Sequence, residues 1–256
     1  MLLNCASTTT AFESLAAAAG VPPHDVHTAL TAIDWTDLEE HNDPERALPQ
    51  LAAERLGRHL GGFSEVRYFH GTRTRDADSF RRHGLLPLGA ALEGIWRELR
   101  EIGADQLGDA EFETLRTEIE GNGGGDGGRL YRLKTPALQH HGPFAEYVRE
   151  HFLHPQELSS HDYLRTPELV EDIAHAAEEM FDVDLLAAYT AATKPCIVAF
   201  DMPMDDDGPA IEATCWYLWA AARRELTRAA CGGFDGQGVA VPPTAIRDVE
   251  IIDVPW

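Results

Sequence analysis

The sequence lacks the features that would place the chain in a membrane or make it depend on disulfides. Its four cysteines are widely spaced and form no Cys-x-x-Cys pair, so neither a disulfide framework nor a zinc ribbon is indicated. No apolar run approaches the roughly 20 residues that a membrane-spanning helix needs. Residues 1–6 have neither the basic start nor the long apolar stretch of a secretory signal. We therefore expect a cytoplasmic protein with no membrane partner.

Lysine is also scarce, since Lys134 and Lys194 are the only two and arginine supplies the other basic residues. The 43 acidic residues outnumber the 21 basic ones, and the formal net charge is −22. A surface this acidic repels phosphate backbones at long range, which argues against broad nucleic-acid binding. The simpler interpretation is a solvated acidic surface. The alternative is an anionic face for a basic protein partner, or one that mimics nucleic acid.

Two common catalytic signatures are absent as well. No serine stands in a Gly-x-Ser-x-Gly motif, which argues against the commonest hydrolase architecture. The glycine-rich stretch at residues 121–128 lacks Gly-Lys-Ser/Thr, so it is not a phosphate-binding loop of the Walker type. Its composition instead predicts a mobile tip, which closes a helical insertion at about residues 90–128.

The apolar pattern predicts two parts, a helical N-terminal extension at residues 1–62 and a mixed domain at residues 63–256. In the extension, Phe12, Leu15 and Ala19 share one helix face, and Gly20 ends that helix. Beyond it, short strand-like runs alternate with helical stretches, so we predict an α+β fold with a split, mostly antiparallel sheet. Strands are predicted at residues 66–69, 129–135, 196–200, 238–241 and 249–252, and helices after Pro143, after Pro167 and over residues 211–230.

A His-Gly-Thr step, His70-Gly71-Thr72, follows the strand-like run Val66–Phe69, and Gly84-Leu85-Leu86-Pro87 comes shortly after it. This order resembles the opening of the NAD site of ADP-ribosyltransferases, the family that includes diphtheria-toxin-type and poly-ADP-ribosylating enzymes. The closing stretch at residues 236–246, with its Val-Pro-Pro turn, resembles the last strand of such domains. The resemblance covers roughly residues 66–254 and implies a split antiparallel sheet that binds NAD as a substrate.

The resemblance implies three site positions on separate strands. His70, Gly71 and Thr72 match the first, which holds the adenosine ribose and the nicotinamide amide. Tyr131, on the next predicted strand, corresponds to the second, an aromatic ring that stacks on nicotinamide. Such a ring also suits a cationic pyridinium on physical grounds, because its face attracts positive charge.

The third position usually holds a glutamate that contacts the reacting ribose, and here the sequence departs from the family pattern. Gln237 stands in its place, and Asp235 lies two residues earlier. Cleavage of NAD passes through an oxocarbenium-like cation, so a nearby anion lowers the barrier. Either Asp235 acts instead, or Gln237 gives altered chemistry, or the domain binds without catalysing. Glu212 is a fourth candidate.

A histidine-rich stretch offers a competing site. It contains His140, His141, His151, His154 and His161, but no His-Glu-x-x-His motif. Histidines at polar helix ends are more often solvated than bound to a metal, so we predict no metal site.

The function that these features favour is ADP-ribosyl transfer from NAD to a macromolecular acceptor, a protein rather than a nucleic acid. An RNA 2'-phosphotransferase-like enzyme is an alternative, but its polyanionic substrate conflicts with the charge of −22. A non-catalytic acidic ligand-binding or interaction protein of the same fold is the alternative from another class.

Overall fold

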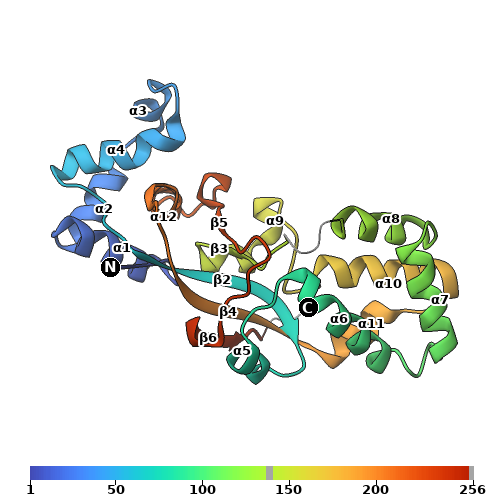
Figure 1. Cartoon of the computed structure of the whole chain (residues 1–256). Coiled ribbons are helices and arrows are strands. Elements are labelled where there is room, and N and C mark those ends of the chain that lie inside the picture. The colour runs from blue at the N-terminus through green and yellow to red at the C-terminus, as the bar shows by residue number, and fades with distance from the viewer. Residues whose placement is uncertain (137–140, 254–256) are drawn as a thin grey trace. The chain divides into compact units, whose positions relative to one another are not determined.

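The computed structural model describes residues 1–136 and 141–253. It combines helices with one sheet, so the predicted α+β class is confirmed (Figure 1). The chain forms two compact units. The first contains residues 1–70, 145–160 and 199–234, and the second contains residues 71–144, 161–198 and 235–256. These units cut across the predicted boundary at residue 62, since two later segments group with the N-terminal helices.

The strands of the described residues form a sheet in the order β5-β3-β2-β4-β6, with β1 also paired to β2. β1 runs parallel to β2, with Leu3 opposite Val66, and β3 runs antiparallel to β2, with Phe69 opposite Glu146. The strand bounds are β1 Leu2–Asn4, β2 Glu65–Thr74, β3 Phe144–Glu146, β4 Lys194–Pro203, β5 Gly233–Asp235 and β6 Ile246–Ile251. The predicted strands at residues 66–69, 196–200 and 249–252 are therefore confirmed as parts of β2, β4 and, nearly in full, β6.

In the first unit, helices surround α12 (Gly208–Ala221). This helix is apolar on nearly all sides and buried from Ala210 to Ala220 apart from Glu212, as expected of a helix inside a core. Three N-terminal helices pack against it, namely α1 (Thr8–Ala19), α2 (Pro23–Thr31) and α4 (Pro44–Leu56). The shorter elements of this unit are α3 (Trp35–Glu39), α9 (Pro155–Leu158) and the 3-10 turns η2 (Arg149–Leu153) and η3 (Arg228–Ala230).

The ends of α1 illustrate how local sequence sets a helix boundary. Ser7 caps the first turn by accepting from the Thr10 N–H, and the Thr10 side chain accepts the Ser7 N–H in return. Gly20 ends the helix with a φ of 68°, a left-handed conformation that glycine adopts without steric cost. The predicted stop at Gly20 is confirmed.

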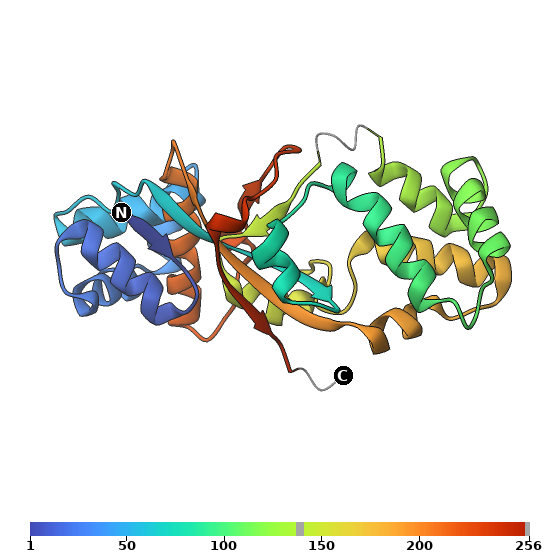
Figure 2. The same cartoon turned by 60° about the horizontal axis from the view of Figure 1, so that its bottom comes forward.

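The second unit contains a helical bundle with a hydrophobic core of its own (Figure 2). Its fully buried residues include Leu99, Leu115, Ile119, Ile173 and Leu185. The bundle consists of α6 (Leu88–Ile102), α7 (Asp109–Glu120), α8 (Gly125–Lys134), α10 (Glu168–Phe181) and α11 (Leu185–Ala192). The helix predicted after Pro167 is confirmed as α10. This unit also contains α5 (Asp78–His83) and the 3-10 turn η4 (Pro243–Ala245).

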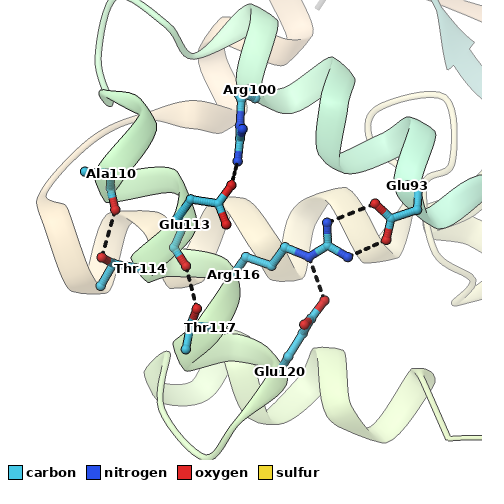
Figure 3. Close-up of polar contacts among 8 residues, drawn as sticks. All are labelled: Glu93, Arg100, Ala110, Glu113, Thr114, Arg116, Thr117 and Glu120. Carbon is cyan, nitrogen blue, oxygen red and sulfur yellow. Dashed lines mark hydrogen bonds and ion pairs between the residues drawn. The ribbon is translucent and has the colours of Figure 1, made fainter.

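Charged side chains join α6 to α7 on the bundle surface (Figure 3). Arg116 forms ion pairs with Glu93 of α6 and with Glu120, one turn further along α7. Its guanidinium also lies over the Trp96 ring, 5.5 Å from the ring centroid. Arg100 pairs with Glu113 in the same way. All three acidic partners are exposed and both arginines are at least partly exposed, so these pairs orient the helices more than they stabilise them.

The strand predicted at residues 129–135 is wrong, because these residues belong to α8 and the Thr135 cap that follows it. Gly127, Gly128 and Tyr131 form the buried side of this helix, at spacings of three and four residues. The apolar pattern missed this face because glycines supply two of its buried positions. The predicted loop at residues 121–128 is shorter than expected, because its last four residues are the first turn of α8.

Two further predictions near the sheet are also wrong. The helix expected after Pro143 is replaced by β3 and η2. The strand expected at residues 238–241 is a turn followed by a single bridge between Val241 and Leu85. Both departures arise from pairing with residues distant in the sequence, which local patterns do not encode.

Candidate functional site

The His-Gly-Thr step lies inside β2, not at its end. β2 continues through the step to Thr74, so the strand predicted to end at Phe69 is longer than expected. His70 and Thr72 are half-buried, whereas Gly71 is buried. The division between the two compact units falls between His70 and Gly71.

Arg73 immediately follows the step, and its guanidinium is buried at 6% exposure. Its Nε donates to the Thr193 hydroxyl at 2.9 Å, and its Nη1 donates to the Leu164 carbonyl at 2.7 Å. Its Nη2 donates to the carbonyls of Thr190 and Thr193, both at 2.9 Å. Burial lowers the pKa of Arg73, although nearby acidic groups act in the opposite direction.

Arg73 was not among the site residues predicted from the sequence. The signal was an arginine directly after the motif, in a strand whose alternation places it on the same side as Gly71. All of the hydrogen bonds described for Arg73 go to uncharged acceptors. Arg73 therefore holds the end of β2 in place and does not bind an anion.

Tyr131 lies on α8 and not on a strand, so the reasoning that selected it does not hold. Its side chain is buried at 2% exposure in the core of the bundle. The Trp96 Nε1 donates to its hydroxyl at 3.4 Å, with the two rings edge to face. Burial raises the pKa of Tyr131. In this position the ring fills the bundle core.

Asp235 and Gln237 lie together at a tight turn after β5. The Gln237 N–H donates to Asp235 Oδ1 at 2.9 Å, and both side chains are exposed. Gln237 has a φ of 47°, a left-handed conformation that is uncommon for a residue with a side chain. The turn is fixed to the chain before β3, because the Gly236 N–H donates to the Pro143 carbonyl and the Gly238 N–H to the Gly142 carbonyl, both at 3.0 Å.

Phe144, the first residue of β3, directly follows Gly142 and Pro143, whose carbonyls accept the hydrogen bonds of this turn. Its side chain is 57% exposed, unusual for a phenylalanine. Its ring covers Gly142, where an added Cβ would lie 3.4 Å from a ring carbon. Because a helix was predicted after Pro143, the sequence pattern did not indicate Phe144 as a site residue.

Two segments that support the family resemblance, residues 84–87 and residues 236–246, pair with each other in the second unit. The Leu85 N–H donates to the Val241 carbonyl at 3.0 Å, and the Val241 N–H donates back to the Leu85 carbonyl at 2.9 Å. Gly84 permits this approach, since an added Cβ there would lie 1.9 Å from the Val241 carbonyl oxygen. Leu88 extends the contact by donating its N–H to the His141 carbonyl at 3.1 Å.

Glu212, the fourth candidate, lies half-buried on α12 in the first unit. Burial raises its pKa, and the nearby carboxylates of Glu45 and Asp43 raise it further. Asp235 and Gln237 belong to the second unit. Glu212 is thus grouped with the acidic residues at the start of α4.

The histidine-rich stretch does not form a metal centre among the described residues, where no group of three potential ligands occurs. His140 lies outside the described residues. His154 pairs with Glu157, and His161 bonds the Thr166 carbonyl. His151 is buried, and its Nδ1 lies 3.6 Å from a Glu146 carboxylate oxygen, too far for a hydrogen bond.

Two cavities of about 540 and 550 Å³ lie in the first unit. None of the residues predicted for the NAD site lines either cavity, whereas His154 of the histidine-rich stretch lines the second. The described part of the chain holds no helix with the length and apolar character needed to cross a bilayer. Comparisons with protein-family models, with curated proteins and with solved structures gave no match.

Proposed function

We propose that the chain transfers ADP-ribose from NAD to a macromolecular acceptor and releases nicotinamide. The observation that carries the proposal is the reciprocal pairing of Leu85 with Val241. The two residues belong to the Gly-Leu-Leu-Pro step and to the closing stretch, which supported the resemblance independently. A chance match in sequence has no reason to bring these two distant segments into hydrogen-bond contact.

In this proposal the His70-Gly71-Thr72 step binds NAD and Asp235 supplies the anion. The Asp235 carboxylate is exposed at the end of β5, and one of its oxygens accepts the Gln237 N–H. An anion stabilises the cation that develops as the bond to nicotinamide breaks. Gln237 contributes a neutral hydrogen bond to a ribose hydroxyl. Phe144 takes the role first predicted for Tyr131, because it is an exposed ring that directly follows the two carbonyls to which the Gln237 turn is bonded.

The acceptor in this proposal is a protein, because the charge of −22 opposes a polyanionic acceptor. A second candidate function, NAD binding without turnover, is favoured by the neutral Gln237 at the third position. A domain that binds NAD without cleaving it would be expected to have His70-Gly71-Thr72 but to lack the glutamate.

The test is to incubate the full chain with NAD and to measure released nicotinamide by chromatography. Asp235→Asn should lower the release by about 10²–10³-fold, since it removes the anion. Asparagine can still accept the Gln237 N–H, so this substitution keeps the turn. Gln237→Glu should raise the release, because it adds a second anion beside the developing cation.

Asp248→Asn is the matched control, because it removes an exposed carboxylate from β6 in the same unit. It should leave nicotinamide release unchanged. Saturable NAD binding that His70→Ala removes, without any release, would favour the non-catalytic function. Absence of both binding and release would overturn the proposal.

A further inference from the structure

The first unit contains a cavity of about 540 Å³ whose lining is rich in tryptophan. Trp35 of α3 lines it together with Trp216 and Trp219 of α12. Trp35 is 52% exposed, which is unusual for so large an apolar side chain. Trp216 and Trp219 are buried. The volume is in the range of small-molecule sites, which is about 300–1,000 Å³.

The polar edges of all three rings are already bonded within the protein. The Trp35 Nε1 donates to Glu39 at 2.8 Å. The Trp216 Nε1 donates to the Glu45 carbonyl at 3.0 Å, and the Trp219 Nε1 donates to the Ile33 carbonyl at 2.9 Å. The rings therefore have only carbon and π surface left to offer a ligand.

The planes of the three rings meet at steep angles, so no two of the rings are parallel. The Trp35 centroid lies 6.4 Å from that of Trp216 and 6.2 Å from that of Trp219, with the ring planes 61° and 47° apart. Trp216 and Trp219 are 5.3 Å apart at 72°. A planar ligand such as guanidinium needs a parallel ring on which to stack, whereas a rounded group can touch rings that meet at an angle.

This cluster already holds one cation. The Arg223 guanidinium lies 3.8 Å from the centroid of the Trp219 ring, within the range of a cation–π contact. Arg223 is kept there by its bonds to the carbonyls of Trp219 and Ile33, at 2.9 and 2.8 Å. The contact shows that the Trp219 face attracts positive charge.

Carboxylates surround the same cavity. Asp43, Glu45 and Glu225 line it, and all three are exposed. Asp43 pairs with Arg46 at 3.4 Å, whereas the described residues provide no ion-pair partner for Glu45 or Glu225. The raised pKa of Glu212 has Glu45 and Asp43 among its causes, which marks the region as negative. An entering cation would relieve this repulsion.

We propose that this cavity binds an alkylated ammonium group, with the tryptophan rings contacting its methyl groups and the carboxylates balancing its charge. The chemistry is shared by a free quaternary ammonium compound and by a methylated lysine side chain of a protein. Neither ligand takes part in NAD chemistry, so the site is independent of the function proposed above.

Calorimetric titration of the full chain with choline tests the proposal. The neutral control is 3,3-dimethyl-1-butanol, which has the shape of choline but carbon in place of nitrogen. Choline should bind at least about tenfold more tightly, because only the charged ligand gains cation–π and ionic attraction. Equal binding of the two ligands, or binding of neither, would overturn the proposal.

Variants locate the site. Trp35→Ala should weaken choline binding by about tenfold, and Trp35→Phe by less, because phenylalanine retains a weaker π face. Both changes are at an exposed position, and melting temperatures would verify that the fold is kept. Glu45→Gln should weaken binding about two- to fivefold. Glu54→Gln removes the same charge from the same helix outside the cavity and should have no effect.

A peptide with one trimethyl-lysine, compared with its unmethylated form, distinguishes the two sources of the ammonium group. Binding of the methylated peptide more tightly than choline assigns the site to a protein partner. Tighter binding of choline assigns it to a free compound. Full choline affinity in Trp35→Ala would contradict the site in either case.

Discussion

At the scale of the residue, Arg73 determines how the His-Gly-Thr step is held. Its guanidinium reaches acceptors from Leu164, Thr190 and Thr193, which come from two other parts of the second unit. The hydrogen bonds described above all join the buried Arg73 guanidinium to neutral oxygens. Losing them would leave a buried charge without hydrogen-bond acceptors, which is costly. The position of Thr72 in β2 therefore depends on the residue that follows it.

Arg73→Lys should lower the free energy of unfolding by about 2–4 kcal/mol, because one ammonium cannot reach acceptors that a fork-shaped guanidinium spans. Urea unfolding followed by circular dichroism measures the change. Arg75→Lys, two residues later at a solvated ion pair, is the control and should stay within about 0.5 kcal/mol of the wild type. Equal stability of the two variants would show that the buried bonds contribute little.

At the scale of the element, the glycines of α8 permit a close approach to α10. An added Cβ at Gly127 would lie 2.5 Å from both the Ala176 nitrogen and the Asp172 carbonyl oxygen, which are backbone atoms of α10. Glycine normally weakens a helix by about 1 kcal/mol relative to alanine. Here that cost is offset by packing, because no residue with a side chain fits between the two backbones.

Gly127→Ala should therefore destabilise the protein by about 1–3 kcal/mol, despite the better helix propensity of alanine. Gly94→Ala in α6 is the matched control. A Cβ there meets only the tip of Arg97, at 3.9 Å, so this change should stabilise by about 0.5–1 kcal/mol. Thermal unfolding of both variants gives the comparison, and a stabilised Gly127→Ala would contradict the close packing of α8 on α10.

At the scale of the whole molecule, the excess of acidic residues dominates. With 43 acidic and 21 basic residues, like charges repel across both compact units. The described ion pairs are mostly at exposed side chains, such as Arg46 with Asp43 and Arg129 with Asp126, and contribute little each. We therefore expect net repulsion to outweigh surface attraction.

Raising sodium chloride from about 0.01 M to about 0.5 M should increase the melting temperature, because the screening length falls from about 30 Å to below 10 Å. Scanning calorimetry at a constant pH of about 7 measures the shift. Potassium chloride should act equally, since screening does not depend on which monovalent cation supplies it. A melting temperature that falls with salt would mean that the exposed ion pairs outweigh the repulsion.

Elements whose residues carry a dense local signal could be predicted without the structure. β4 follows from its unbroken apolar run at Cys196–Phe200, and α10 from the apolar stripe of Leu169 and Ile173 after Pro167. The same holds for the α+β class and for the end of α1 at Gly20. Each of these features depends on residues close together in the sequence. Its apolar periodicity or helix cap can therefore be recognised without knowing which segments pack against it.

Elements that depend on distant partners could not be predicted in this way. Phe144–Glu146 became a strand because Glu146 pairs with Phe69, and the Gln237 turn is fixed by carbonyls at Gly142 and Pro143. Tyr131 was predicted on a strand but lies on a helix. The helical pattern was missed because the buried side of α8 contains glycines, which carry no hydrophobic signal. Likewise, no local pattern joins Trp35 to the tryptophans of α12. These contacts join segments that are far apart in the chain. They stabilise the protein only after folding has brought the segments together, so no local pattern can predict them.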